Sequence, residues 1–180
     1  MSLLDRVREA LDGYRYVTET SALGGVVFEW DGDPLVGVVD DELVVRASGG
    51  GWQTVTGDVA EWIRRSADVV IAECVVRWHA ELRAGEPVAA SRAMLGLVHH
   101  EPDREQLQRL LLEHTRHPDL RHLAVTCLGH MGRLDGEVLP EVMSRLQELR
   151  DDPELGGRAE DALGDIESFS GRGQMDRTAG

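Results

Sequence analysis

The apolar positions of the first dozen residues recur at the spacing of a helix. Leu4, Val7 and Leu11 stand three or four residues apart with charged residues between them, and Gly13 follows. This pattern is typical of a short amphipathic helix that buries one face and ends at a glycine. We therefore predict a helix over residues 3–12.

Between residues 24 and 55 the pattern changes to short, valine-rich runs. Turn-forming residues separate these runs at Asp31–Pro34 and Asp40–Asp41, and a small-residue cluster lies at 48–51. Short β-branched and aromatic runs between such turns are typical of strands. We predict a meander of three or four antiparallel strands, drawn from GGVVFEW, PLVGVV, ELVVRA and WQTV.

After residue 55 the apolar positions return to helical spacing. Asp58 is positioned to cap a helix that begins with VAEWIRRS, and a longer helix is expected over Ala67–Arg83. The chain is thus predicted to be α+β, with a small antiparallel β-meander module and flanking helices before an α-helical array. The predicted domains are 1-66 and 67-169, and 170-180 is expected to be a disordered tail because it has almost no apolar residues.

The helical part contains an internal repeat. Leu-Gly dipeptides recur at a regular interval with their glycines at Gly96, Gly129 and Gly164, so the intervals are 129 − 96 = 33 and 164 − 129 = 35 residues. Intervals of this length are typical of helix-pair repeats. Because glycine inside a helix costs about 1 kcal/mol relative to alanine, its recurrence predicts either a close approach of a neighbouring helix or a shared helix end.

The last two copies align without gaps, as HPDLRHLAVTCLGHM and DPELGGRAEDALGDI. Pro118 and Pro153 are expected to start the first helix of each pair, where the missing N–H costs nothing. A second helix is predicted over 137–150. Neither helix can bury its apolar stripe alone, so stacking of the pairs is the expected source of stability.

Charge, apolar run length and cysteine content narrow the classes of partner and cellular compartment. The chain has 33 acidic and 19 basic residues, all of the latter arginine, and a net charge of −14. This excess disfavours binding to nucleic acid and would attract a basic protein partner. The alternative, which is favoured, is that the acidic surface simply keeps the protein soluble. No apolar run reaches the roughly 18 residues of a membrane span, and Cys74 and Cys127 suit buried thiols. A cytoplasmic protein without membrane contact is expected, and the oligomeric state is left open.

Histidines are the strongest candidates for chemistry in this sequence. Six of the seven lie between positions 99 and 130, and the rings of His114, His117 and His122 could approach one another. The alternative is that they satisfy carbonyl groups at helix ends, and this interpretation is favoured. No nucleophile motif or phosphate loop is visible, so we expect no enzyme activity, no cofactor, no metal and no catalytic residue.

The span from His117 to Ile166 is similar to HEAT-like repeats, whose first helix begins DPxxR and ends ALG. More narrowly, it resembles the small HEAT-repeat proteins encoded beside bacterial polymorphic toxins and presumed to be immunity proteins. The resemblance implies a protein-binding scaffold over 67-169. In such arrays the second helices line the concave side, so the predicted partner-binding residues are Gln108, Glu141, Arg145 and Glu148.

The N-terminal part, residues 4–67, resembles the TfoX/Sxy N-terminal domain. The matching residues are Gly24 and Gly25, the hairpin FEWDGDPLVGVV, the strand DDELVVRA and Trp62. The chain departs from the family in having Ala-Leu where Met-Phe usually precedes the two glycines. This resemblance implies a small α+β module over 1-66 with no catalytic residues.

Three functional hypotheses follow. The first is a protein-binding adaptor, in its sharpest form an immunity protein that neutralises a toxin. The second is a TfoX-like regulatory protein that acts through protein contacts, with the repeats as its docking arm. The third is a metal enzyme, for which the histidine cluster is the only support.

Overall fold

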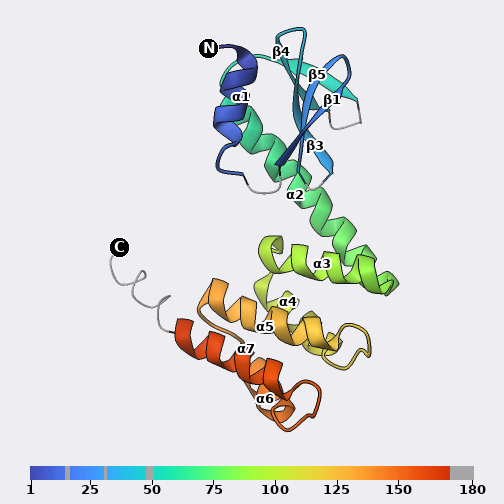
Figure 1. Cartoon of the computed structure of the whole chain (residues 1–180), viewed down its shortest axis with the longest axis vertical. Helices are drawn as coiled ribbons and strands as arrows, with labels where there is room; N and C mark the ends of the chain where they lie inside the picture. The colour runs from blue at the N-terminus through green and yellow to red at the C-terminus, as the bar shows by residue number, and fades with distance from the viewer. Residues whose placement is uncertain (15–16, 31, 48–50, 171–180) are drawn as a thin grey trace. The chain divides into compact units, whose positions relative to one another are not determined.

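The computed structural model contains two compact units, Met1–Cys74 and Val75–Gly180 (Figure 1). It describes residues 1–14, 17–30, 32–47 and 51–170. One helix and an antiparallel sheet precede a run of helices, so the α+β class is confirmed. The two units meet inside a helix, between Cys74 and Val75, whereas the sequence predicted a domain boundary after residue 66.

The first helix, α1 (Leu3–Leu11), confirms the amphipathic pattern. The Ser2 hydroxyl accepts a hydrogen bond from the Asp5 backbone N–H, and the Asp5 carboxylate accepts one from the Ser2 backbone N–H. This capping box satisfies two donors at the start of the helix. Val7 and Leu11 are the buried residues of its apolar face.

A five-stranded antiparallel meander follows, with the strands in sequence order. The predicted runs form four of its strands. The additional strand, β1, has the polar sequence VTETSA and pairs along its length with β2. The strands are β1 (Val17–Ala22), β2 (Gly25–Trp30), β3 (Asp33–Val39), β4 (Glu42–Arg46) and β5 (Trp52–Val55).

Two of the hairpins close through two-residue turns with left-handed backbone. Leu23 and Gly24 have φ of 59° and 78°, and Asp40 and Asp41 have φ of 50° and 61°. Paired positive φ values match the right-handed twist of the strands that such a turn joins. The Asp40–Asp41 turn signal is therefore confirmed. The predicted turn at 48–51 lies mostly outside the described residues.

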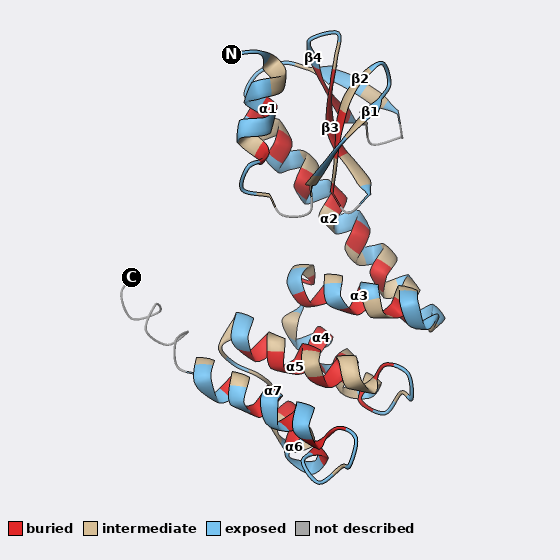
Figure 2. Cartoon of the chain, viewed as in Figure 1, coloured by how far each residue is buried: buried red, intermediate tan, exposed pale blue. Residues whose placement is uncertain are grey.

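Helix α2 (Val59–Ala84) replaces the two helices predicted in this region. Its 26 residues include neither glycine nor proline, so nothing interrupts the backbone hydrogen bonds near Ala67. The Asp58 carboxylate caps its start by accepting from the Glu61 N–H at 3.1 Å. Figure 2 shows a buried stripe along the helix, which includes Ile63 in the first unit and Trp78 in the second.

The second unit is a two-layer arrangement of helices. Figure 1 shows α3, α5 and α7 lying one below another with α4 and α6 behind them. Helix α5 contacts both α3 and α7, and α4 contacts α6. None of the helices in the described ranges combines the length and apolarity needed to cross a membrane. The helices are α3 (Pro87–His100), α4 (Arg104–His114), α5 (Arg121–Asp135), α6 (Pro140–Leu149) and α7 (Gly156–Phe169).

The helix starts differ from the prediction at two prolines. Pro118 and Pro153 lie in turns before α5 and α7, not at the first helical positions. In the second of these turns the Asp152 carboxylate accepts from the N–H groups of Glu154 and Leu155, at 2.9 and 3.0 Å. These bonds satisfy backbone donors in the turn that precedes the helix.

Close helix approach is confirmed at two of the three recurring glycines. A Cβ at Gly96 would lie 2.6 Å from Cε2 of Trp78, and one at Gly129 would lie 2.9 Å from Cα of Ala162 on α7. At Gly164 a Cβ would meet nothing within 4 Å, so the prediction of close approach is wrong there. All three glycines lie inside helices, which excludes the alternative of a shared helix end.

The C-terminal end of α7 is capped by Ser170. Its N–H and its hydroxyl both donate to the carbonyl of Ile166, at 2.8 and 2.6 Å. Ser170, the first residue of the predicted disordered tail, is thus held against the helix. Residues 171–180 lie outside the described residues.

Candidate partner-binding surface

Two adjacent helices carry the four residues predicted to face a partner. Gln108 lies on α4, and Glu141, Arg145 and Glu148 lie on α6. The two helices contact each other. Only Glu141 and Glu148 are exposed, so the four side chains do not form one continuous surface.

Gln108 is buried, with 5% of its surface exposed. Its Oε1 accepts a hydrogen bond of 2.7 Å from the backbone N–H of Leu139, the residue that precedes α6. Pro140 follows at the start of that helix and has no N–H of its own. In the structure Gln108 therefore ties the start of α6 to α4.

Arg145 also makes internal contacts. Its Nε donates to the hydroxyl of the buried Thr115 at 3.1 Å, and its Nη1 lies 3.1 Å from a carboxylate oxygen of Glu148. The arginine thus connects the end of α4 to α6. The side chain of Glu148 remains 65% exposed and keeps a charge-balancing partner.

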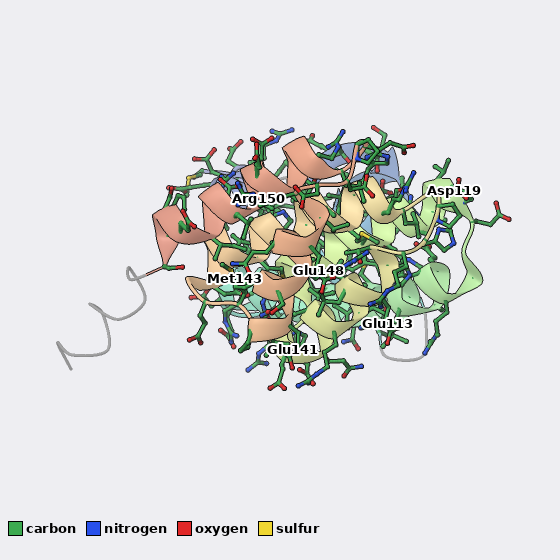
Figure 3. The ribbon with its side chains drawn as sticks, turned by 90° about the horizontal axis from the view of Figure 1, so that it is seen from below. Glu113, Asp119, Glu141, Met143, Glu148 and Arg150 are labelled. Atoms are coloured by element: carbon green, nitrogen blue, oxygen red, sulfur yellow. The ribbon has the colours of Figure 1, made fainter. Side chains whose placement is uncertain are left out.

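Glu113 joins Glu141 and Glu148 to give an acidic face on α4 and α6. Figure 3 shows these three labelled glutamates on the neighbouring ribbons of the two helices. All three are exposed, and within the described residues the carboxylates of Glu113 and Glu141 have no ion-pair or hydrogen-bond partner. We call Glu113, Glu141 and Glu148 the acidic face.

Sequence reasoning missed Glu113 although a signal for it was present. The inward positions of α4 are Leu107, Gln108 and Leu111. Glu113 is two residues beyond Leu111, on a different side of the helix from these three, as the helical period requires. Treating α4 in the same way as α6 would have added Glu113 to the predicted surface.

The predicted histidine cluster does not converge. The rings of His114 and His117 stack with centroids 6.2 Å apart, but Nε2 of His122 lies 3.8 Å from the Glu154 carboxylate. His114 Nδ1 bonds the carbonyl of Leu110 at 2.8 Å, as expected for a histidine at a helix end. Within the described ranges, no group of three histidine, cysteine or acidic side chains could hold a metal ion.

Two further titratable groups have environments that shift their pKa. Burial lowers the pKa of His100 below 6.5, and the neighbouring His99 lowers it further. Burial also raises the pKa of the Cys127 thiol to about 12, which makes that thiol a weak nucleophile at neutral pH. Neither group belongs to the acidic face.

The acidic face is suited to attracting positive charge. Its carboxylates are solvent-exposed, and unpaired charges of one sign attract the opposite charge over a range set by the ionic strength. The arrangement of these glutamates does not by itself identify a related protein whose residue roles could be assigned to this chain. No protein-family model, curated protein or solved structure matches this chain.

Proposed function

We propose that the chain is a non-enzymatic adaptor of the HEAT-like repeat type that binds a basic protein through the acidic face. In its sharpest form it is an immunity protein that masks a toxin. The observation that carries the proposal is the pair Glu113 and Glu141. These exposed carboxylates lie on contacting helices, and no described residue balances their charge.

The repeat supports the same proposal. The helices of the second unit stack in two layers, and Gly129 allows α5 and α7 to approach closely. Stacked helix pairs of this kind present a row of second helices as an extended surface. In this chain, the acidic face lies on two such second helices, α4 and α6.

Long-range charge attraction would be expressed mainly in the association rate. A basic partner should be steered toward the acidic face, so association should slow steeply as salt is added. Reversing the charge of Glu113 and Glu141 should lower the association rate constant about tenfold or more at low ionic strength. The same change should flatten its salt dependence.

The test begins with capture of partners from a lysate of the native cells. The association rate of the purified partner is then measured at several salt concentrations. Glu113→Arg/Glu141→Arg is compared with Asp161→Arg/Glu167→Arg, which makes the same charge change at exposed carboxylates of α7. Slower association in the first variant alone supports the proposal. Equal rates in both variants, or capture of no basic protein, would overturn it.

A regulatory role for the first unit is the second candidate. That unit has a five-stranded sheet of its own, and its edge strand β1 has one side free of strand partners within the described residues. An exposed edge can pair with a strand of another protein. This candidate would be favoured over the first if the whole chain captured transcription proteins and the Glu113→Arg/Glu141→Arg variant captured them equally well.

A further inference from the structure

A groove of about 470 Å³ lies within the second unit, between the last turns of α2 and one face of α4. Its volume falls within the range of about 300–1,000 Å³ that ligand sites occupy. On α4 the lining positions recur three and four residues apart from Gln106 to His114, so one whole face of this helix forms a wall. Arg83 and Leu82 contribute to the opposite wall from α2.

The charge of this groove is opposite to that of the whole chain. Arg83 and Arg109 line it, and Glu113 is its only acidic lining residue, in a chain of net charge −14. Arg109 pairs with the exposed Glu105. Arg83 is exposed and its guanidinium has no hydrogen-bond or ion-pair partner among the described residues, so its five N–H donors are open to a ligand.

Apolar side chains line the groove beside these charges. Leu82 and Leu120 are 3% and 1% exposed, and Leu110 is half-buried. A lining of this kind favours a ligand that combines an apolar part with a negatively charged part. The accessible part of Leu110 can contact the apolar part while an arginine binds a carboxylate in a two-pronged geometry.

Compensation of the helix dipole explains only part of this arrangement. Arg83 lies in the last turn of α2, and His114 in the last turn of α4, where a positive charge is favourable in any protein. That effect does not require a hollow between the two helices. It also does not account for Arg109, which lies in the middle of α4.

We propose that this groove binds a short acidic peptide segment that has apolar side chains next to its carboxylates. The inference rests on the proposed function, because it adds a second feature to the partner. Glu113 belongs to both the groove and the acidic face, so the two sites adjoin. A partner that uses both has an acidic, apolar segment beside a basic surface.

The test uses a fluorescein-labelled eight-residue peptide in which leucine and glutamate alternate, and the full-length chain. Binding is measured by fluorescence anisotropy, with a second peptide that has glutamine in place of glutamate. We expect saturable binding of the glutamate peptide, and at least tenfold weaker binding of the glutamine peptide. Equal binding of the two peptides, or no saturable binding of either, would refute the proposal.

Variants locate the binding within the chain. Arg83→Glu/Arg109→Glu should weaken peptide binding at least tenfold, whereas Arg133→Glu/Arg158→Glu, at exposed arginines of α5 and α7, should leave it within about twofold. The milder Arg83→Gln/Arg109→Gln keeps the test valid if the charge reversal disturbs folding, which circular dichroism reports. Equal losses in the groove variant and the α5/α7 variant would show nonspecific attraction and overturn the proposal.

The two proposals fail separately. The peptide assay needs no native partner, so a partner that is still captured through the acidic face while the peptide does not bind eliminates the groove proposal alone. Peptide binding without any basic partner eliminates the proposed function and leaves the groove as a separate site.

Discussion

Substitution of Gly129 by alanine tests the close approach of α5 and α7. The added Cβ would lie 2.9 Å from Cα and 3.0 Å from Cβ of Ala162. Carbon atoms that are not bonded rest about 3.5–4.0 Å apart, so these contacts are short by about 0.5–1 Å. One of the atoms met belongs to the backbone of α7, so no side-chain rotation can relieve the overlap. The helix itself has to move.

Two terms set the expected change in the free energy of unfolding. Overpacking in a filled core costs about 1–3 kcal/mol, while alanine is favoured over glycine inside a helix by about 1 kcal/mol. Gly129→Ala should therefore lower the free energy of unfolding by up to about 2 kcal/mol. Gly164→Ala adds a Cβ in open space at the equivalent repeat position, so it should raise that free energy by up to about 1 kcal/mol.

The difference between the two variants isolates the packing term because the propensity term is common to both. Urea unfolding followed by circular dichroism at 222 nm measures it, with the midpoint and the slope compared for each variant. We expect Gly129→Ala to be less stable than Gly164→Ala by about 1–3 kcal/mol. If Gly129→Ala stabilises the chain as much as Gly164→Ala does, the close contact between α5 and α7 is not present in solution.

Three other predictions concern buried or half-buried groups. The pKa of His100 is lower in the folded chain than the ordinary 6.5, so its contribution to stability is present above that value and is lost as the pH falls through the folded pKa. Thermal melts from pH 7.5 to 5.5 should show a smaller loss of stability for His100→Gln than for wild type; an identical loss would contradict this. The Cys127 thiol has a pKa of about 12, so it should react with a thiol reagent at pH 8 far more slowly in the folded chain than in urea. The reaction is measured in a Cys74→Ala variant, so that Cys127 is the reacting thiol. Comparable rates in the two conditions would show that the Cys127 thiol is accessible in the folded chain. Gln108→Leu removes the acceptor of the Leu139 N–H, so it should lower the free energy of unfolding by about 1–3 kcal/mol, and a neutral effect in urea titration would show that water replaces the amide.

Periodicity predicted those elements whose burial leaves a pattern in the chain. Helix α1 has apolar residues at the spacing of its buried face, and strands β2 to β4 contain runs of buried apolar residues. Strand β1 has no such pattern, because four of its six residues are exposed and it forms by pairing with β2. Its existence depends on a neighbouring strand, which local sequence does not reveal.

The repeat places the three glycines at equivalent positions but does not indicate which neighbour each one meets. Gly96 contacts Trp78, which precedes it in the chain, whereas Gly129 contacts Ala162, which follows it. Gly164 occupies the same repeat position, and its Cβ site is open. The intervals of 33 and 35 residues therefore conceal different packing environments, and only the fold separates them.

The candidate site shows why exposure is harder to predict than helix position. Gln108 is polar and lies on a second helix, so the sequence placed it on the surface. Its amide is buried because the Leu139 N–H at the start of α6 needs an acceptor. The donor that Gln108 binds lies 31 positions away in the chain. The spacing of apolar residues in α4 therefore gives no indication that Gln108 is buried.

Local charge in this chain is set by which residues are paired, and the total of −14 does not describe it. Arg145 is bonded to Thr115 and Glu148, so it adds little free positive charge to α6. Arg83 has no such partner among the described residues, and it makes one wall of a groove attractive to carboxylates. A partner selected by net charge alone would be uniformly basic. Under the two proposals the unpaired charges would instead select a partner that is basic over the acidic face and acidic where it meets Arg83, and such a pattern of two signs is more specific than either sign alone.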